Sequence, residues 1–268
     1  MSNPMPTSSA SLSPACPSPE TVIRVENLTA AYGDDVIMRD VSFEVYRGEV
    51  FVILGGSGCG KSTLLKHMIG LYTPAAGHIL IEGVDIANAN PAELQHLHEC
   101  FGVAYQSGAL FGSMTLLENV RLPLEEFTHL PDNAIDTIAL MKLKLVGLQG
   151  YSKHMPSELS GGMQKRAAIA RAMALDPKII FLDEPSAGLD PVTSAELDVL
   201  ILRLARSLDI TFVIVTHELQ SIFAIADRVI MLDKRKKGII ATGTPLDLRD
   251  HNTDPWVQQF FHRRAGNT

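Results

Sequence analysis

Several features that would place a protein in a particular class are missing from this sequence. It holds three cysteines in 268 residues, widely spaced and without a CxxC or Cys/His metal pattern, so we expect a reduced, cytosolic protein. Lys and Arg total 23 against 30 Asp and Glu, a net charge of −7. This balance argues against a nucleic-acid-binding protein, which would need clustered positive charge. No apolar run approaches the ~18 residues that span a bilayer.

The first twenty residues differ in composition from the rest of the chain. They are rich in Pro and Ser and contain no Lys or Arg, and they lack the basic start and apolar stretch of a secretory signal. Such a segment cannot bury enough apolar surface to offset the entropy lost on ordering. We therefore predict a disordered tail over residues 1–20, one folded domain over residues 21–250, and a C-terminal helix and tail over residues 251–268.

Short apolar runs alternate with helical stretches in the folded part. Val50–Leu54 is followed by glycines and then by helical spacing over Ser62–Leu71, and Ile179–Leu182 and Thr211–Val215 are similar strand-length runs. This alternation predicts an α/β fold with a mostly parallel sheet covered on both faces. Strand signals vanish between about residues 107 and 175, which indicates a helical insertion. Further expected elements are strands over Val22–Leu28, Val36–Val45 and on both sides of Asp233–Gly238, and helices over Asn133–Leu148, Pro245–Asp250 and Trp256–Arg263.

A glycine-rich loop joins the first buried strand to its helix and matches G-x-x-x-x-G-K-[ST]. Its glycines let backbone N–H groups converge on phosphate oxygens without Cβ clashes, and the helix that follows presents unpaired N–H groups to the anion. We expect Lys61 to reach the β- and γ-phosphates and the Ser62 hydroxyl to ligate Mg²⁺. This phosphate loop and the first helical turn comprise Gly55, Gly56, Ser57, Gly58, Cys59, Gly60, Lys61, Ser62 and Thr63.

Two acidic residues end the apolar run at Ile179–Leu182. In a parallel sheet this places Asp183 and Glu184 at the carboxyl edge, where nucleotide binds in such folds. Alone, the pattern would indicate only a solvated strand end. Beside the phosphate loop it predicts that Asp183 holds Mg²⁺ and that Glu184 orients and deprotonates the attacking water.

The order of the remaining motifs resembles that of the ATP-binding cassette (ABC) ATPases over about residues 22–245. The segment Leu159-Ser160-Gly161-Gly162 opens the helix containing Gln164–Ala174, as the signature motif does in that family, although the next position is Met163 where the family usually has Gln. The other matching positions are Tyr32 ahead of the phosphate loop, Gln106 after Phe101–Tyr105, Ser186-Ala187-Gly188-Leu189-Asp190, and His217 after Thr211–Thr216.

The resemblance implies a P-loop NTPase cassette with an antiparallel β subdomain, a helical subdomain over about residues 107–175, and hydrolysis of ATP with Mg²⁺. It implies that Tyr32 stacks on adenine and that Gln106 acts in catalysis and contacts the metal beside Ser62 and Asp183. His217 would position the γ-phosphate and act with Glu184. In the family two chains sandwich two ATP, so Ser160, Gly161 and Gly162 would complete the site of the opposing subunit.

Four less generic segments are similar to the ATPases of the Mla system, which maintains outer-membrane lipid asymmetry, and of related Mce-type lipid transporters. This similarity implies a cassette homodimer, peripheral on the cytoplasmic face of the inner membrane, that serves the transport of phospholipid. The implied partners are a permease dimer, an MCE-domain protein and a STAS-domain protein, with no nucleic acid. The segments are Met155–Met163, Tyr105–Phe111, Met141–Leu148 and Asp254–Phe261.

Alternatives stay open at this point. The motifs also suit the ATPase of another ABC importer, or a cassette that signals mechanically through a membrane partner. Apolar residues in Ser107–Phe111 and Met114–Val120 suit either a permease contact or a subdomain core. Cys59 suits redox sensitivity or simple space filling.

Two further segments also allow more than one interpretation. Lys234–Lys237 suits either lipid headgroups or a solvated hairpin turn. Phe260–Thr268 either crosses to a second subunit or frays as a chain terminus.

Overall fold

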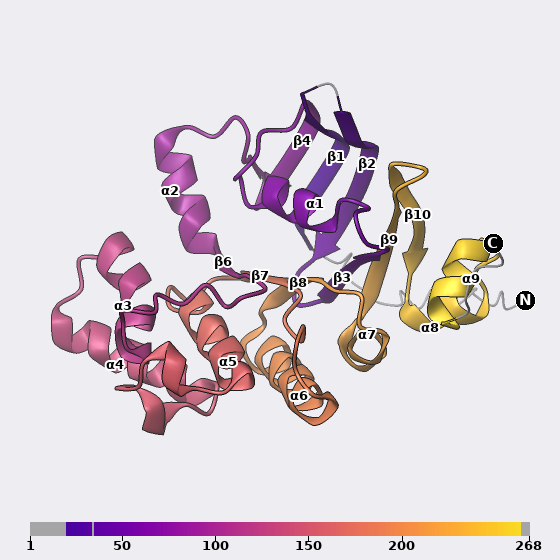
Figure 1. Ribbon diagram of the computed structural model, residues 1–268. Helices are drawn as coiled ribbons and strands as arrows, with labels where there is room; N and C mark the ends of the chain where they lie inside the picture. Colours follow the sequence, from indigo (N-terminus) through magenta and orange to yellow (C-terminus); the bar gives the residue numbers. More distant parts are fainter. Residues whose placement is uncertain (1–19, 34, 264–268) are drawn as a thin grey trace, which may run out of the picture.

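The computed structural model describes residues 20–33 and 35–263, which form two sheets and the helices around them (Figure 1). All of the predicted N-terminal tail except Glu20, and the last five residues of the predicted C-terminal tail, lie outside the described residues. The strands are β1 (Thr21–Tyr32), β2 (Asp35–Tyr46), β3 (Val50–Gly55), β4 (Ala76–Ile81), β5 (Val84–Asp85), β6 (Phe101–Ala104), β7 (Ile179–Asp183), β8 (Thr211–Val215), β9 (Arg228–Asp233) and β10 (Gly238–Gly243). The helices are α1 (Lys61–Met68), α2 (Pro91–Cys100), α3 (Leu116–Phe127), α4 (Asp132–Leu145), α5 (Gly161–Ala172), α6 (Pro191–Leu208), α7 (Leu219–Ile225), α8 (Pro245–Asp250) and α9 (Pro255–Phe261), with short 3-10 turns at Gln149–Tyr151 and Pro156–Glu158.

The larger sheet has the strand order β10-β9-β3-β8-β7-β6, and all its pairs are parallel except β9 with β10. The smaller sheet, β2-β1-β4-β5, is antiparallel throughout. The prediction of an α/β fold with a mostly parallel sheet and an antiparallel β region is therefore confirmed.

Strand β3 connects the two hydrophobic cores of the protein. Its side chains alternate, so that Val50, Val52 and Leu54 pack with helices α3 to α7 while Phe51 and Ile53 pack with β1, β2, β4 and α1. Figure 1 shows the same arrangement, with α1 and the small sheet on one face of the large sheet and α5 and α6 on the other. Each fully buried large apolar side chain stabilises the fold by about 1.5–3 kcal/mol.

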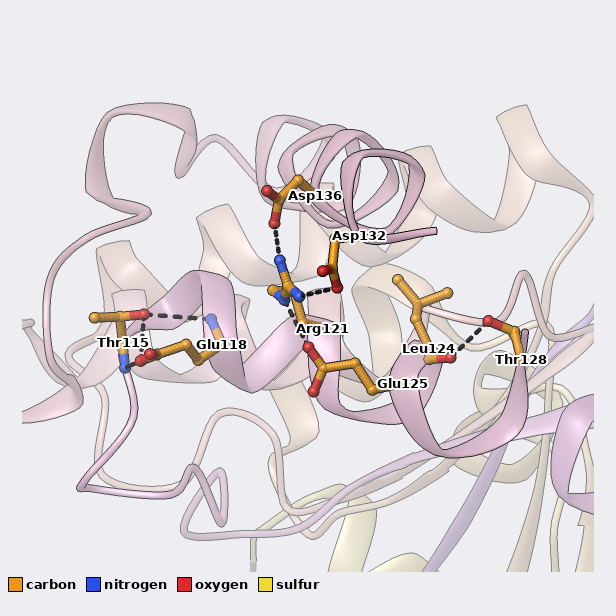
Figure 2. Close-up of polar contacts among 8 residues, drawn as sticks. All are labelled: Thr115, Glu118, Arg121, Leu124, Glu125, Thr128, Asp132 and Asp136. Carbon is orange, nitrogen blue, oxygen red and sulfur yellow. Dashed lines mark hydrogen bonds and ion pairs between the residues drawn. The ribbon is translucent and has the colours of Figure 1, made fainter. Parts of the chain in front are cut away.

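The predicted helical insertion contains α3, α4 and α5. Thr115 and Glu118 form a capping box at the start of α3, where the Thr115 N–H donates to Glu118 Oε2 over 2.7 Å (Figure 2). Arg121 of α3 donates to Asp132 and Asp136 of α4, and also to Glu125 of its own helix. These contacts hold the two helices of the insertion side by side.

Three predicted helices end earlier than the sequence pattern suggested. Helix α1 stops at Met68 rather than at residue 71, because Gly70 has φ +76°. Helix α4 stops at Leu145 rather than at residue 148, where Gly147 has φ +79°. Glycine in the left-handed region commonly terminates helices. The predicted helix over residues 256–263 likewise ends at Phe261.

Helices α8 and α9 follow the last strand; α8 packs against α7 and α9, and Phe261 of α9 contacts Phe223 of α7. In the part of the chain that the structure covers, every helix is too short or too polar to cross a bilayer.

Candidate functional site

The carboxyl ends of four neighbouring parallel strands gather most of the predicted site residues. Strand β3 leads into the phosphate loop, β7 ends at Asp183, β8 precedes His217, and β6 precedes Gln106. Because these strands are adjacent in the order β3-β8-β7-β6, residues separated by up to 162 positions in the sequence share one edge of the sheet. This edge is where ligands bind in open α/β folds.

The phosphate loop wraps around the start of α1. Gly60 has φ +101°, and a Cβ there would lie 2.8 Å from Met38 Cε of β2, so this position requires glycine. No side chain caps α1 and its first turn carries no acidic residue, which leaves its N–H groups open to an anion. Lys61 Nζ donates to the carbonyl oxygens of Gly55 at 3.0 Å and Gly56 at 3.3 Å. The ammonium therefore lies over the loop that would hold the phosphates.

Two oxygen groups meet beside the first turn of α1. The Ser62 hydroxyl donates to Asp183 Oδ1 over 3.4 Å. Burial and the neighbouring Glu184 carboxylate raise the pKa of Asp183, against the effect of Ser62 and nearby lysines. A hydroxyl and a carboxylate are oxygen ligands that Mg²⁺ accepts, and it typically completes its shell with water and phosphate oxygens. The pair fits this role as a partial site, and no cluster of three or more His, Cys, Asp or Glu side chains suited to a metal occurs among the described residues.

Glu184 lies in a buried and strained position directly after β7. Its backbone has φ +47°, and its N–H donates to the Val215 carbonyl over 2.8 Å. The residue is 8% exposed. His217 Nδ1 lies 2.8 Å from Glu184 Oε1, whereas the buried Oε2 atom has no protein partner among the described residues. Strain and an unpaired polar atom together are typical of a functional carboxylate.

Tyr32 and Cys59 differ in solvent exposure. Tyr32, at the end of β1, is 49% exposed and makes an edge-to-face contact with Tyr72 at 5.6 Å between ring centroids. Met38 of β2, the strand that pairs with β1, lies within contact distance of Gly60, so Tyr32 belongs to the hairpin that borders the phosphate loop. Cys59 is buried, and burial raises the pKa of its thiol against the opposing effect of Lys61. This favours the space-filling role over a reactive thiolate.

The signature segment begins α5 on the other face of the sheet from α1. Ser160 caps the helix, its Oγ accepting the Met163 N–H over 3.3 Å. Gly161 lies against Leu189, and a Cβ at Gly162 would lie 2.4 Å from Thr193 Cγ2. The structure thus brings Ser160, Gly161 and Gly162 to the start of α6, and their contacts in the single chain are not with the phosphate loop.

Residue 163 is Met where the family usually has Gln, and the structure shows what Met163 and the neighbouring Gln164 contact. Met163 packs against the hydrophobic core. Gln164 Nε2 donates to the carbonyl oxygens of Pro156 at 3.0 Å and Leu159 at 3.2 Å. The amide of Gln164 therefore holds the turn that precedes the signature segment.

Two surface predictions have different outcomes. Phe111 is 48% exposed, whereas Leu110 and Leu117 pack against the core, so the subdomain-core alternative suits Leu110 and Leu117 and leaves Phe111 as the exposed residue of these three. The basic run after Asp233 forms the β9–β10 turn, where Arg235 pairs with the buried Asp233 at 2.7 Å. The hairpin interpretation of this run is confirmed.

Sequence reasoning missed two cations of α5 that reach the loop following β6. Lys165 Nζ donates to the Gln106 carbonyl oxygen and, over 3.4 Å, to the Glu184 carbonyl oxygen. Arg171 donates to the carbonyl oxygens of Ala109 at 2.7 Å and Gly108 at 3.1 Å. Burial lowers the pKa of both side chains. The available signal was composition, because Lys165, Arg166 and Arg171 are the three cations of a helix otherwise rich in alanine.

Comparison with known proteins places these features in one family. A sequence profile of the ABC transporter family matches residues 38–187. The chain is 44% identical to the intermembrane phospholipid transport system ATP-binding protein MlaF of Haemophilus influenzae, over 90% of each chain. It is also 44% identical to a probable ribonucleotide transport ATP-binding protein, mkl, of Mycobacterium leprae, over 91% of this chain and 70% of the relative.

Solved structures agree with this result. The fold matches the dimeric structure of MJ0796, a bacterial ABC transporter cassette, with a TM-score of 0.75 and 31% identity over 83% of this chain and 98% of the other. It matches cbiO1 of Clostridium perfringens, part of the ABC transporter complex cbiONQ, with a TM-score of 0.78 and 29% identity over 91% and 98%. A third match, at TM-score 0.73 and 30% identity over 83% and 98%, is a post-hydrolysis state of MJ0796 bound to ADP and Pi.

Proposed function

Because this chain belongs to the ABC transporter family, we propose that it is the ATP-hydrolysing subunit of a transporter that moves phospholipids. ATP hydrolysis is supported by one observation. The phosphate loop, the Ser62–Asp183 pair and the buried Glu184 carboxylate lie together at one edge of the sheet. Binding of ATP and its hydrolysis follow from the family.

The residues of the sheet edge suggest how each contributes. The amides of the phosphate loop and Lys61 would bind the β- and γ-phosphates. Ser62 and Asp183, with the side chain of Gln106, would hold Mg²⁺, which when bound neutralises charge on the phosphates. The Tyr32 ring would stack on adenine, because its face is accessible at the end of β1.

The chemistry of hydrolysis would depend on the Glu184–His217 pair. The Glu184 carboxylate would accept a proton from an attacking water. Its Oε1 is held by His217 at 2.8 Å, and its buried Oε2 has no protein partner among the described residues. His217 is largely exposed, so its other ring nitrogen can reach the γ-phosphate. We propose Glu184 as the general base, His217 as the residue that positions the γ-phosphate, and Gln106 as the group that senses the metal and the water.

A second chain would complete the site. Ser160, Gly161 and Gly162 sit at the open N-terminus of α5, where Ser160 and backbone N–H groups form an anion-binding end. Their own contacts point to α6 rather than to the phosphate loop of the same chain. We propose that a homodimer closes with these residues on the γ-phosphate held by the other subunit, as the dimeric relative suggests.

The phospholipid cargo is proposed from the relatives. The match to MlaF of Haemophilus influenzae covers 90% of both chains, and the E. coli K12 MlaF is 40% identical over 90% of this chain and 88% of its own. The mycobacterial relative named for ribonucleotide transport has equal identity but is matched over 70% of its length. We therefore favour phospholipid over ribonucleotide, over the cargo of another importer and over mechanical signalling without transport.

The proposed partners are a permease dimer, an MCE-domain protein and a STAS-domain protein, on the cytoplasmic face of the inner membrane. Phe111 is the exposed apolar side chain of the loop that we expect the permease to contact. The test is a mild-detergent pull-down of the tagged full chain from its own membranes, with proteins, lipids and nucleotides identified by mass spectrometry.

Recovery of a permease, an MCE-domain protein, a STAS-domain protein and phospholipid would support the lipid proposal. Recovery of a permease with a soluble substrate-binding protein, of bound ribonucleotide other than ATP or ADP, or of no membrane protein would remove phospholipid as the cargo. The hydrolytic assignment would survive each of these results, because ATPase assays of the purified chain test it separately.

A further inference from the structure

Lys165 lies where the helical region meets two parts of the proposed catalytic site. Its ammonium donates to the carbonyl oxygen of Gln106 and, over 3.4 Å, to that of Glu184. The first carbonyl begins the loop after β6, and the second belongs to the proposed general base. One side chain of α5 thus joins two separate elements of the sheet edge.

The backbone of Glu184 needs such support. A non-glycine residue at φ +47° is in a strained backbone conformation and persists only where its surroundings hold it. Its N–H is held by the Val215 carbonyl at 2.8 Å. Its carbonyl oxygen accepts the Ala187 N–H at 3.1 Å together with Lys165 Nζ. Lys165 is therefore the contact that links this peptide to the helical region.

Helix α5 holds the other end of the connection rigidly. At Gly102 of β6 an added Cβ would lie 1.9 Å from the Ala172 carbonyl oxygen, so β6 and α5 approach as closely as glycine permits. Arg171, six positions after Lys165, donates to the carbonyls of Gly108 and Ala109. The loop from residue 106 to residue 109 is consequently attached to α5 at both ends.

The far side of the same loop is fixed by a buried amide. Asn119 of α3 accepts the Phe111 N–H at 2.8 Å and donates to the Phe111 carbonyl at 3.1 Å. Arg171 lies 5.9 Å from the centroid of the exposed Phe111 ring. The loop and α5 are therefore expected to move together. Lys165 would transmit such a movement to Glu184.

Resting on the function proposed above, we propose that Lys165 is a positioning residue for Glu184: it ties the carbonyl of Gln106 to that of Glu184 and sets the direction of the base. The carbonyl contacts with Gln106 and Glu184 are the geometric basis of this role. Lys165 does not replace Lys61, whose ammonium lies over the phosphate loop instead.

The experiment measures steady-state ATP hydrolysis by the purified full chain carrying Lys165→Met, Lys165→Arg or Lys165→Gln. Lys178→Met is the matched control, because Lys178 pairs with Glu82 at 3.0 Å and precedes β7 at the opposite edge of the sheet. Misplacing a catalytic group by about 1 Å costs up to ~10²-fold in rate. We expect Lys165→Met to lower kcat between about 10- and 100-fold with KM for Mg-ATP within about twofold.

The conservative variants separate positioning from mere stability. Lys165→Arg keeps a cationic donor and should recover most of kcat, and Lys165→Gln, with a neutral donor, should fall between Arg and Met. Lys178→Met should retain wild-type kcat. In single-turnover assays, adding Lys165→Met to Glu184→Gln should slow hydrolysis by less than about threefold, since groups that act as one unit are not additive.

Unchanged kcat in Lys165→Met, or in Lys165→Gln should the Met variant fail to fold, would overturn the proposal. A rise in KM at constant kcat, or failure of Lys165→Arg to recover the rate, would also overturn it. So would a double variant whose loss of rate equals the product of the losses in Lys165→Met and Glu184→Gln. Failure of the proposed function is distinguishable, because it would remove ATP hydrolysis from the wild-type chain and from Lys178→Met as well.

Discussion

The Nδ1 atom of His217 lies 2.8 Å from Oε1 of Glu184, and the second carboxylate oxygen of Glu184 is buried without a protein partner among the described residues. The two residues follow neighbouring strands, since Asp183 of β7 pairs with Val215 of β8. A buried unpaired acceptor costs about 1–3 kcal/mol. The fold tolerates that cost at the carboxyl edge of the sheet, which is where the phosphate loop also lies.

Replacing Glu184 by Gln should leave ATP binding intact and lower turnover by about 10²–10⁴-fold, because the amide cannot accept the proton of water. The measurements are kcat for ATP hydrolysis and the Kd for a fluorescent ATP analogue. Hydrolysis at the wild-type rate would remove Glu184 from the role of base. Lys178→Met, with its contact at the other end of β7, serves as the unaffected control.

The exposed ring of Tyr32 provides a test of nucleotide stacking. Tyr32→Phe should change the Kd for ATP by less than about twofold, because stacking uses the ring face rather than the hydroxyl. Tyr32→Ala should weaken binding by roughly tenfold, the factor that corresponds to about 1.4 kcal/mol of lost contact. Isothermal titration calorimetry with ATP would give both values, and equal affinities for Phe and Ala would show that adenine binds elsewhere.

The raised pKa of Asp183 predicts a stability that depends on pH. Because burial and Glu184 raise this pKa, the folded chain binds the proton more tightly than the unfolded chain, and the ionised carboxylate destabilises the fold. Asp183→Asn should therefore raise the Tm of the nucleotide-free chain at pH 7. The difference should shrink as pH falls through the raised pKa and vanish below the ordinary value of 3.8.

Thermal unfolding followed by circular dichroism from pH 7 downwards would test the Asp183 prediction. The same variant should lose the extra stability that Mg²⁺ with ATP gives the wild type, since the carboxylate ligand is gone. A Tm difference independent of pH would contradict the argument, because a neutral contact of residue 183 would then account for it.

Arg121 connects α3 to α4 through three carboxylates, Glu125, Asp132 and Asp136 (Figure 2). Arg121→Met keeps most of the apolar stem and removes the charge, and should lower the free energy of unfolding by about 1 kcal/mol at low salt. The loss should become smaller at 1 M salt, where charges are screened within about 3 Å. Urea unfolding at two salt concentrations measures it.

Arg24→Met is the matched control for Arg121, because Arg24 makes half-exposed pairs with Glu44 at 2.9 Å and Glu26 at 4.0 Å on the small sheet. Arg24→Met should lower the free energy of unfolding less than Arg121→Met, because Arg121 contacts three acids and is more buried. An equal decrease for both variants at low salt would show that the α3–α4 network adds nothing beyond ordinary surface ion pairs.

Much of the fold follows from local patterns in the sequence. The apolar runs at Ile179–Leu182 and Thr211–Val215 became β7 and β8, because a continuous apolar run suits a strand buried on both faces. Elements without such a run, including β4, α2 and α6, were not located in advance. Helix ends were misjudged at Gly70 and Gly147, since the apolar spacing continues past the point where the backbone turns left-handed.

The proposed nucleotide chemistry of this protein can be read from its sequence, because the phosphate loop and the Asp183–Glu184 pair are contiguous motifs whose geometry is local. The distant groups that support these motifs become visible in the folded chain. Lys165 contacts Gln106 and Glu184 across 59 and 19 positions, and His217 reaches Glu184 across 33. Such contacts depend on the order of strands in the sheet and on how closely α5 packs against β6, and no local pattern of residues encodes either.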